Sequence, residues 1–243
     1  MTGYQRKEQA LSSHLNIYFA VAFSLENMYT FSNERRKKMK REKYQTFINK
    51  RIMEMPPGSV FVTSDFADIA PSSAINMSLS RLEASGSIRR ILRGIYDKPR
   101  FSKLLNEPVA PDPSKVAYAI ARKNRWSIIP MGDTALNILR LSTQVPAVWQ
   151  YVSDGPYKEY SYDNVHILFR RTSNKEATGY SYITGLVIQG LRALGREHVS
   201  ETVIKSLRER LSPEEKKVLL NEAQGTTAWI FDYIKEICKE HEV

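Results

Sequence analysis

The first periodic pattern of apolar residues predicts a helix from Arg41 to Met55. Its apolar side chains recur at steps of three and four residues, which places them on one helix face. They are Tyr44, Phe47, Ile48, Ile52 and Met55. Prolines and a glycine at 56–58 end this helix, Val60–Val62 is a strand candidate, and the hydroxyl and carboxylate residues that follow can cap a short helix at Phe66–Ile69.

A second long helix is predicted between Pro71 and Gly86. Ser72 or Ser73 can cap its start, and Gly86 readily takes the left-handed conformation that ends a helix. Its inward face carries apolar residues at i, i+4 and i+7. These are Ile75, Leu79 and Leu82.

Two short strands follow this helix, at Ile88–Leu92 and Ile95–Asp97, around a turn at Arg93 and Gly94. Helix, strand, short helix, long helix and hairpin, in this order, are typical of a winged helix-turn-helix, whose second motif helix enters the DNA major groove. We therefore predict a DNA-binding domain at residues 39–98.

The outward face of the Ser72 to Ser85 helix offers side chains that can read base edges. Asn pairs with adenine, Arg with guanine, Ser with several bases, and Met contacts the thymine methyl group. The candidates on this face are Ser73, Asn76, Met77, Ser80 and Arg81. On the hairpin, Arg89, Arg90 and Arg93 are predicted to contact phosphates or a minor groove. The same face is also compatible with an ordinary solvated helix or a protein-contacting winged helix.

The second half of the chain begins after a proline-rich segment at 99–111, which is predicted to be a linker. A domain at 112–243 then mixes helices and strands. A helix starts at Asp112-Pro113, strands are expected at 126–129 and 148–152, and a hairpin is expected around Asp163-Asn164. The remaining predicted elements are helices at 133–141, 182–194, 200–210 and 213–240. The fold class is therefore α+β.

The charge distribution supports a polyanionic partner for the first half. The whole chain carries a net charge of +10. Residues 1–107 contain 18 Lys and Arg against 10 Asp and Glu, whereas the remainder contains 18 against 16. Lys and Arg neutralise phosphates where they cluster, so the basic first half fits double-stranded DNA. The basic residues in and just before the first predicted helix are candidates to extend this contact: Lys40, Arg41, Lys43, Lys50 and Arg51.

The residues give no constellation for catalysis, metal binding or a cofactor. The single cysteine, Cys238, excludes an internal disulfide framework and favours a cytoplasmic protein, and the four histidines match no ligand spacing. Cys238 and His241 lie at a charged C-terminal end, unsuited to a thiol–imidazole pair. Ser142 to Gln144 with Asp154 form a polar cluster that turn formation explains more simply. We expect no enzyme, metal or cofactor.

The N-terminal segment is of doubtful authenticity. Its apolar run, Leu15–Leu25, superficially resembles a secretory signal but is too short to span a bilayer. The run Glu34–Lys38 would be encoded by purine-rich codons, as a bacterial ribosome-binding sequence would be. We hypothesise that translation starts at Met39 and that residues 1–38 are not translated; an amphipathic helix is the alternative. An N-terminal peptide upstream of Met39, detected by mass spectrometry of the native protein, would contradict this hypothesis.

Several short segments resemble the AbiEi-type antitoxins of type IV abortive-infection toxin–antitoxin systems. The resemblance rests on the order of Arg89-Arg90, Arg93–Asp97, Pro99–Phe101, Leu141–Ala147 and Ser153–Gly155, and covers roughly Tyr44 to Leu194. It implies an N-terminal winged helix that represses its own promoter. It also implies a C-terminal domain that counteracts a nucleotidyltransferase toxin without a stable complex. The alternatives are a winged-helix protein-interaction module and an orphan transcriptional regulator.

Overall fold

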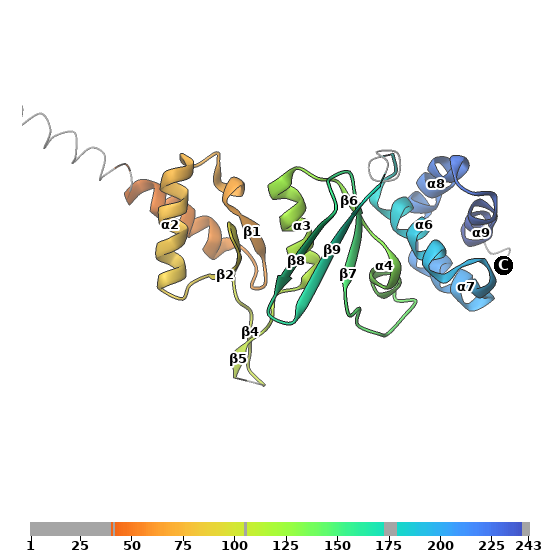
Figure 1. Ribbon diagram of the computed structural model, residues 1–243, viewed down its shortest axis with the longest axis horizontal. Helices are drawn as coiled ribbons and strands as arrows, with labels where there is room; N and C mark the ends of the chain where they lie inside the picture. The colour runs from red at the N-terminus through yellow and green to blue at the C-terminus, as the bar shows by residue number, and fades with distance from the viewer. Residues whose placement is uncertain (1–39, 41, 105, 173–178, 240–243) are drawn as a thin grey trace, which may run out of the picture. The chain divides into compact units, whose positions relative to one another are not determined.

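The computed structural model describes residues 40, 42–104, 106–172 and 179–239 (Figure 1). The doubtful segment 1–38, Arg41 and His241 lie outside these residues. The chain forms two compact units. The smaller unit contains the described residues up to Met55 together with Phe66–Ser85, and the larger one contains Pro56–Asp65 and Gly86 onward.

The smaller unit contains the helix of residues 42–54 and α2 (Ser72–Ala84). The predicted apolar faces are largely confirmed, because Ile48, Ile52, Ile75, Leu79 and Leu82 are all buried. Phe66 and Ala70, from the segment between the helices, are buried in the same unit. Phe47 differs from the prediction, with 49% of its surface exposed.

The start of α2 also differs from the prediction. Neither Ser72 nor Ser73 is the N-cap; Pro71 holds that position and provides no side-chain hydrogen bond. The carbonyl of Pro71 instead accepts from the N–H groups of Ala74 and Ile75. The helix ends where expected, with Gly86 at a φ of +72°.

The larger unit begins with a three-stranded antiparallel sheet in the order β1-β3-β2. Its strands are β1 (Val60–Val62), β2 (Arg89–Leu92) and β3 (Ile95–Asp97), as the sequence predicts to within one residue. The short helix predicted at Phe66–Ile69 lies three residues earlier, as the 3-10 helix η1 (Thr63–Phe66) directly after β1. Its last residue, Phe66, is the first residue of the second segment of the smaller unit. The segment predicted as a linker carries two further strands, β4 (Phe101–Ser102) and β5 (Glu107–Pro108), paired as a hairpin.

A four-stranded mixed sheet follows, in the order β6-β7-β9-β8. Its strands are β6 (Ile128–Pro130), β7 (Trp149–Ser153), β8 (Lys158–Tyr162) and β9 (Val165–Arg171). The predicted β8–β9 hairpin is confirmed, whereas β7 and β9 pair in parallel. The helices nearest in sequence are α3 (Pro113–Asn124) and α4 (Gly132–Ile138).

The helix α3 shares one apolar core with both sheets. Val116, Ala117 and Ile120 of α3 cluster with Tyr151 and Phe169 of the mixed sheet. The cluster also includes Val62 and Ile95 of the first sheet. The first sheet therefore packs on α3, although the predicted linker at 99–111 separates them in the sequence. The predicted domain boundary at this linker stays a prediction.

The chain ends in a helical layer, coloured cyan to blue in Figure 1. It contains α6 (Tyr182–Leu194), η2 (Arg196–His198), α7 (Glu201–Arg210), α8 (Pro213–Glu222), η3 (Ala223–Gly225) and α9 (Ala228–Cys238). The single helical stretch predicted at 213–240 is thus broken at η3. Ile230, Ile234 and Ile237 supply the buried stripe expected for the last helix. The α+β fold class is confirmed.

Candidate nucleic-acid interface

The side chains of α2 divide sharply between a buried and an exposed face. Ile75, Leu79 and Leu82 are at most 6% exposed. Ser78, which the sequence did not assign to the inner face, is buried among them at 4% exposure. All the predicted base-reading side chains lie on the exposed face: Ser73, Asn76, Met77, Ser80 and Arg81. This face therefore presents amide, hydroxyl, guanidinium and thioether groups to solvent.

One of these side chains is oriented by the neighbouring helix. The Arg81 guanidinium donates a hydrogen bond of 2.5 Å from Nη1 to Oε1 of Gln45. Arg81 presents further N–H donors, because a guanidinium carries five and this contact uses one. Gln45 thus limits the positions Arg81 can take without consuming its capacity to bind a base or a phosphate. Nothing in the sequence of helix 42–54 indicates that Gln45 is the partner of Arg81.

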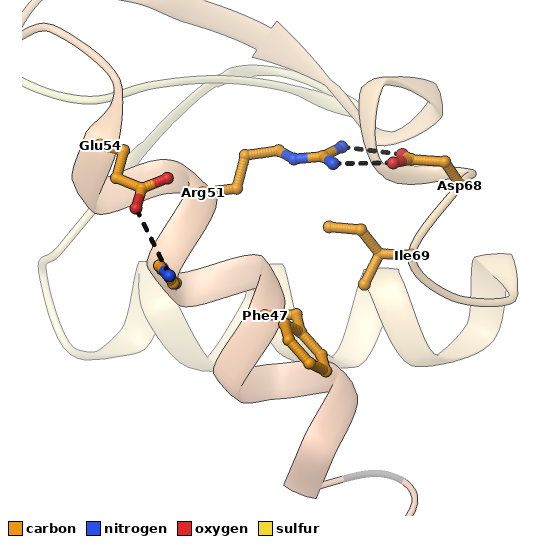
Figure 2. A pocket seen from close by; sticks show the side chains of 6 residues that line it. Phe47, Arg51, Glu54, Asp68 and Ile69 are labelled. Atoms are coloured by element: carbon orange, nitrogen blue, oxygen red, sulfur yellow. Dashed lines mark hydrogen bonds and ion pairs between the residues drawn. The ribbon is translucent and has the colours of Figure 1, made fainter.

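Lys50 and Arg51 contact acidic side chains within the smaller unit (Figure 2). Arg51 donates two hydrogen bonds to the Asp68 carboxylate, at 2.8 and 2.7 Å, and this hydrogen bonding lowers the pKa of Asp68. Lys50 Nζ lies 3.9 Å from Oε1 of Glu54. With Phe47 and Ile69, these residues line a shallow pocket of about 380 Å³. The local acidic partners offset the charge of both cations, so this surface is a weaker polyanion site than the sequence predicts.

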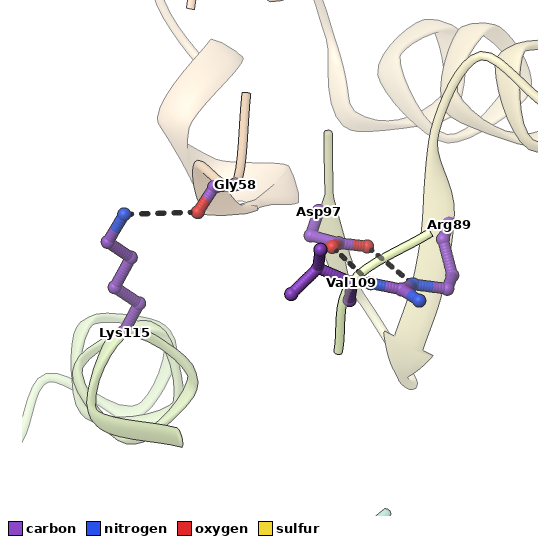
Figure 3. Close-up of polar contacts among 5 residues, drawn as sticks. All are labelled: Gly58, Arg89, Asp97, Val109 and Lys115. Atoms are coloured by element: carbon purple, nitrogen blue, oxygen red, sulfur yellow. Dashed lines mark hydrogen bonds and ion pairs between the residues drawn. The ribbon is translucent and has the colours of Figure 1, made fainter. Parts of the chain in front are cut away.

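The three arginines predicted on the hairpin have different surroundings in the larger unit. Arg90 and Arg93 are exposed. Arg89 instead makes a two-point ion pair with Asp97 on β3, with Nε–Oδ1 and Nη2–Oδ2 distances of 3.0 and 2.7 Å. Its Nη2 also donates to the Val109 carbonyl at 3.0 Å (Figure 3). Asp97 is only 1% exposed, so Arg89 compensates a buried charge.

The turn between β2 and β3 is held by α3. Lys123 Nζ donates to the carbonyl of Arg93. Gly94, next in the turn, has a φ of +73°, a conformation that glycine adopts without a steric cost. A Cβ built at Gly94 would lie 3.5 Å from Lys123 Nζ, which shows how closely the lysine approaches the turn. Arg93 and Lys123 therefore place two positive charges at one end of the hairpin.

Two more cations of α3 bind backbone carbonyls before and within β1. Lys115 Nζ donates to Gly58 at 3.2 Å (Figure 3), and Arg122 Nη2 donates to Val60 at 3.2 Å. Arg122 also contacts the Asp65 carboxylate at 3.2 Å. Lys115, Arg122 and Lys123 are spaced at i, i+7 and i+8, so they share a helix face. That spacing can be read from the sequence, whereas the carbonyl groups that these cations bind cannot.

Polar side chains of the Ser142–Gln144 and Asp154 cluster accept hydrogen bonds from backbone N–H groups in loops. Ser142 Oγ accepts from the N–H of Gln144 at 3.2 Å, and Asp154 Oδ1 accepts from the N–H of Ser127 at 2.9 Å. Burial raises the pKa of the Cys238 thiol. No cluster of three potential metal ligands occurs in the described ranges. Among these same residues, no helix is both long enough and apolar enough to cross a membrane.

The fold and the candidate interface define an α+β protein with an exposed polar face on α2 and an arginine-bearing antiparallel hairpin. Residues 47–219 match the family described as a family of unknown function (DUF6088), and the chain belongs to that family. No curated protein matches it. Among solved structures, the crystal structure of the RV2827C protein from Mycobacterium tuberculosis is similar, with a TM-score of 0.37 and 12% identity over 82% of this chain and 76% of that chain.

Proposed function

We propose that this protein is a transcriptional regulator that binds double-stranded DNA through a winged helix-turn-helix formed by residues 39–98. The proposal rests on one observation: α2 has a buried apolar face and an exposed polar face. Its buried face anchors the helix, while the predicted base-reading residues on the opposite face are exposed: Ser73, Asn76, Met77, Ser80 and Arg81. A helix that reads bases requires this division, because base edges are recognised by side chains free to enter the major groove.

The order and pairing of the elements support the same proposal. Helix 42–54, β1, η1, α2, β2 and β3 follow one another as in a winged helix-turn-helix, and the strands pair in the order β1-β3-β2. In this proposal the β2–β3 hairpin is the wing. Arg90, Arg93 and Lys123 bind phosphates there, and Arg89 is omitted from the contact set because Asp97 and Val109 engage it.

We further propose that the regulated promoter is the protein's own and that the protein is an antitoxin of the AbiEi type, acting on a nucleotidyltransferase toxin. The support is the ordered resemblance of segments between Arg89 and Gly155. In this proposal the protein acts in the cytoplasm without a stable complex with the toxin. Coexpression with a nucleotidyltransferase from a neighbouring gene tests it. Restored growth without copurification is the expected result, and unrelieved toxicity would contradict the antitoxin role.

The experiment that tests DNA binding is an electrophoretic mobility shift of the full chain on its own promoter and on scrambled DNA, at two salt concentrations. We expect specific retardation that weakens with salt by roughly 0.9 log units per log unit of salt for each phosphate contacted. Point variants are preferable to deletion of residues 39–107, because the first sheet packs on α3. Absence of retardation at low salt would favour a protein-interaction module instead.

The matched variants for this experiment are Asn76→Ala, on the exposed face of α2, and Ser206→Ala, on α7. Both substitutions remove a small polar side chain from a helix. We expect Asn76→Ala to weaken specific retardation and Ser206→Ala to leave it unchanged. If Asn76→Ala retards the promoter as specifically, relative to scrambled DNA, as Ser206→Ala does, then Asn76 on α2 does not select the DNA sequence.

A further inference from the structure

The hairpin formed by β4 and β5 is tied to the first sheet at its base. Within the hairpin, Phe101 pairs with Pro108 and Ser102 with Glu107. The N–H of Val109 donates to the Arg100 carbonyl at 2.7 Å, which continues the pairing toward the base. Arg89 then binds the Val109 carbonyl and the Asp97 carboxylate together (Figure 3). The guanidinium of Arg89, on β2, thus binds both the last residue of β3 and the residue that follows β5.

Beyond this base, the hairpin exposes two large apolar side chains, one next to the base and one toward the turn. Leu104 is 92% exposed and Phe101 is 58% exposed. Leu104 has the largest exposed fraction among the exposed large apolar residues that the structure describes. An apolar side chain this exposed, on a hairpin whose base is fixed, is costly to hydrate and gains free energy when a partner covers it.

The charges of the hairpin and of the residues leading into it favour a polyanion as that partner. Lys98, Arg100 and Lys103 are basic, and Glu107 is the acidic residue of the same segment. Arg100 and Lys103 are exposed beside Phe101. Apolar side chains flanked by cations are the combination with which proteins wedge open a base step while binding the adjacent phosphates. An apolar protein interface would not require the cations.

We propose that the β4–β5 hairpin is a second DNA-contacting element, which inserts Leu104 and Phe101 into a groove of the duplex. Arg100 and Lys103 bind the flanking phosphates. Inserted apolar side chains partly unstack a base step and kink the duplex, so the bound promoter is bent. This inference rests on the proposed DNA-binding function and adds a contact outside α2 and the β2–β3 hairpin.

The test compares DNA bending by the wild-type chain and by the double variant Phe101→Ala/Leu104→Ala. Bending is measured from the mobility of equal-length promoter fragments that carry the binding site at different positions. Val145→Ala is the control, because Val145 is an apolar side chain that is 78% exposed elsewhere. We expect the wild type and the control to bend DNA. We expect the double variant to bind the same promoter unbent, with affinity reduced about tenfold.

A charge variant separates a nucleic-acid contact from a protein contact. Arg100→Ala/Lys103→Ala should lower the salt dependence of promoter binding by roughly two phosphate contacts. Unchanged bending by Phe101→Ala/Leu104→Ala, or an unchanged salt dependence of the charge variant, would overturn this inference while leaving the proposed function intact. Failure of the wild type to bind promoter DNA would overturn both. Thermal unfolding of each variant establishes that it is folded, as expected for truncations of exposed side chains.

Discussion

The ammonium group of Lys123 on α3 donates to the backbone carbonyl of Arg93, at the turn between β2 and β3. The position of the proposed wing therefore depends on a helix that the sequence assigns to another domain. Because Lys123 also adds a positive charge beside Arg93, it has two ways to influence DNA binding: it holds the turn and it attracts phosphate.

Replacement of Lys123 by alanine is expected to weaken promoter binding although α2 is untouched. The affinity should fall, and the salt dependence should decrease by roughly 0.9, the value of one phosphate contact. Lys123→Arg should restore the salt dependence, because arginine keeps the charge and a donor. Fluorescence anisotropy titrations at two salt concentrations measure both quantities. Lys217→Ala, an exposed lysine of α8, is the control, and equal behaviour of the two alanine variants would contradict the prediction.

Asn76 and Arg93 are expected to differ in how they affect DNA recognition. Asn76→Ala removes the proposed base contact, so it should cost about 1–3 kcal/mol on the preferred sequence and relax the base choice at one position. Arg93→Ala removes the proposed phosphate contact, so it should weaken all sequences alike. Binding to a library of single-base promoter variants measures this difference. Identical profiles for the two variants would show that the assignment of reading helix and wing is wrong.

Asp97 and Asp68 both bind an arginine through two hydrogen bonds, but their burial differs. Asp97 is 1% exposed, so Asp97→Ala leaves Arg89 with a partly buried, uncompensated charge and should lower the free energy of unfolding by about 3 kcal/mol. Asp68 is 63% exposed, and Asp68→Ala should change stability little because solvent screens that pair. Urea unfolding of both variants checks the contrast. Similar losses for both would refute it.

Glu222 of α8 is expected to make the stability of the helical layer depend on pH. Burial opposes ionisation of its carboxyl group, but hydrogen bonds from Thr184 and from the N–H and hydroxyl of Ser181 outweigh this, so the pKa of Glu222 is lowered. A lowered folded-state pKa means that ionised Glu222 stabilises the fold above its unfolded pKa, about 4.3. This contribution is lost as the pH falls through the lower folded-state pKa.

Glu222→Gln should therefore lower the Tm at about pH 7, and its difference from wild type should shrink as the pH falls below about 4. Thermal unfolding followed by circular dichroism across this range measures the difference. Glu209→Gln, which alters a residue on the exposed side of α7, is the control. A Tm difference for Glu222→Gln that stays constant with pH would contradict the prediction.

Gly155, in the loop after β7, packs against Trp126. A Cβ at this position would lie 2.5 Å from Cε2 of the Trp126 indole, and a rigid ring cannot move aside as an alkyl chain can. Gly155→Ala should therefore destabilise the protein by about 1–3 kcal/mol through overpacking. Gly155→Ala/Trp126→Leu should recover part of the stability lost in Gly155→Ala, and no recovery in urea unfolding would show that the contact is not the cause.

The sequence predicts those features of the fold that depend on local periodicity. The inward residues of α2, the bounds of β1 and the β8–β9 hairpin all follow from the spacing of apolar and turn residues. The break in the last predicted helix was missed because residues 213–240 contain no proline after Pro213, and the single glycine at the end of η3, Gly225, is compatible with a continuous helix.

The parts of the candidate interface that depend on distant partners could not be predicted. Arg89 and Arg90 are each flanked by one isoleucine and one arginine, yet the pairing of β2 with β3 places Arg89 alone beside Asp97. Likewise, Lys123 is thirty residues from Arg93 along the chain, and their contact exists because α3 packs on the first sheet. Charge and spacing identified cations, but the fold decides which of them are engaged internally.

The division of the chain has a consequence for how this architecture can be inherited. The chain passes between the two compact units after Met55, after Asp65 and again after Ser85, so the smaller unit is encoded in two pieces on either side of β1. A recombination event that exchanges residues 39–98 as a block also carries away β1, β2 and β3, whose partners on α3 remain behind. If the proposed DNA-binding function is shared by relatives of this chain, changes of specificity are therefore expected to accumulate as substitutions on α2, with the flanking strands and α3 inherited together.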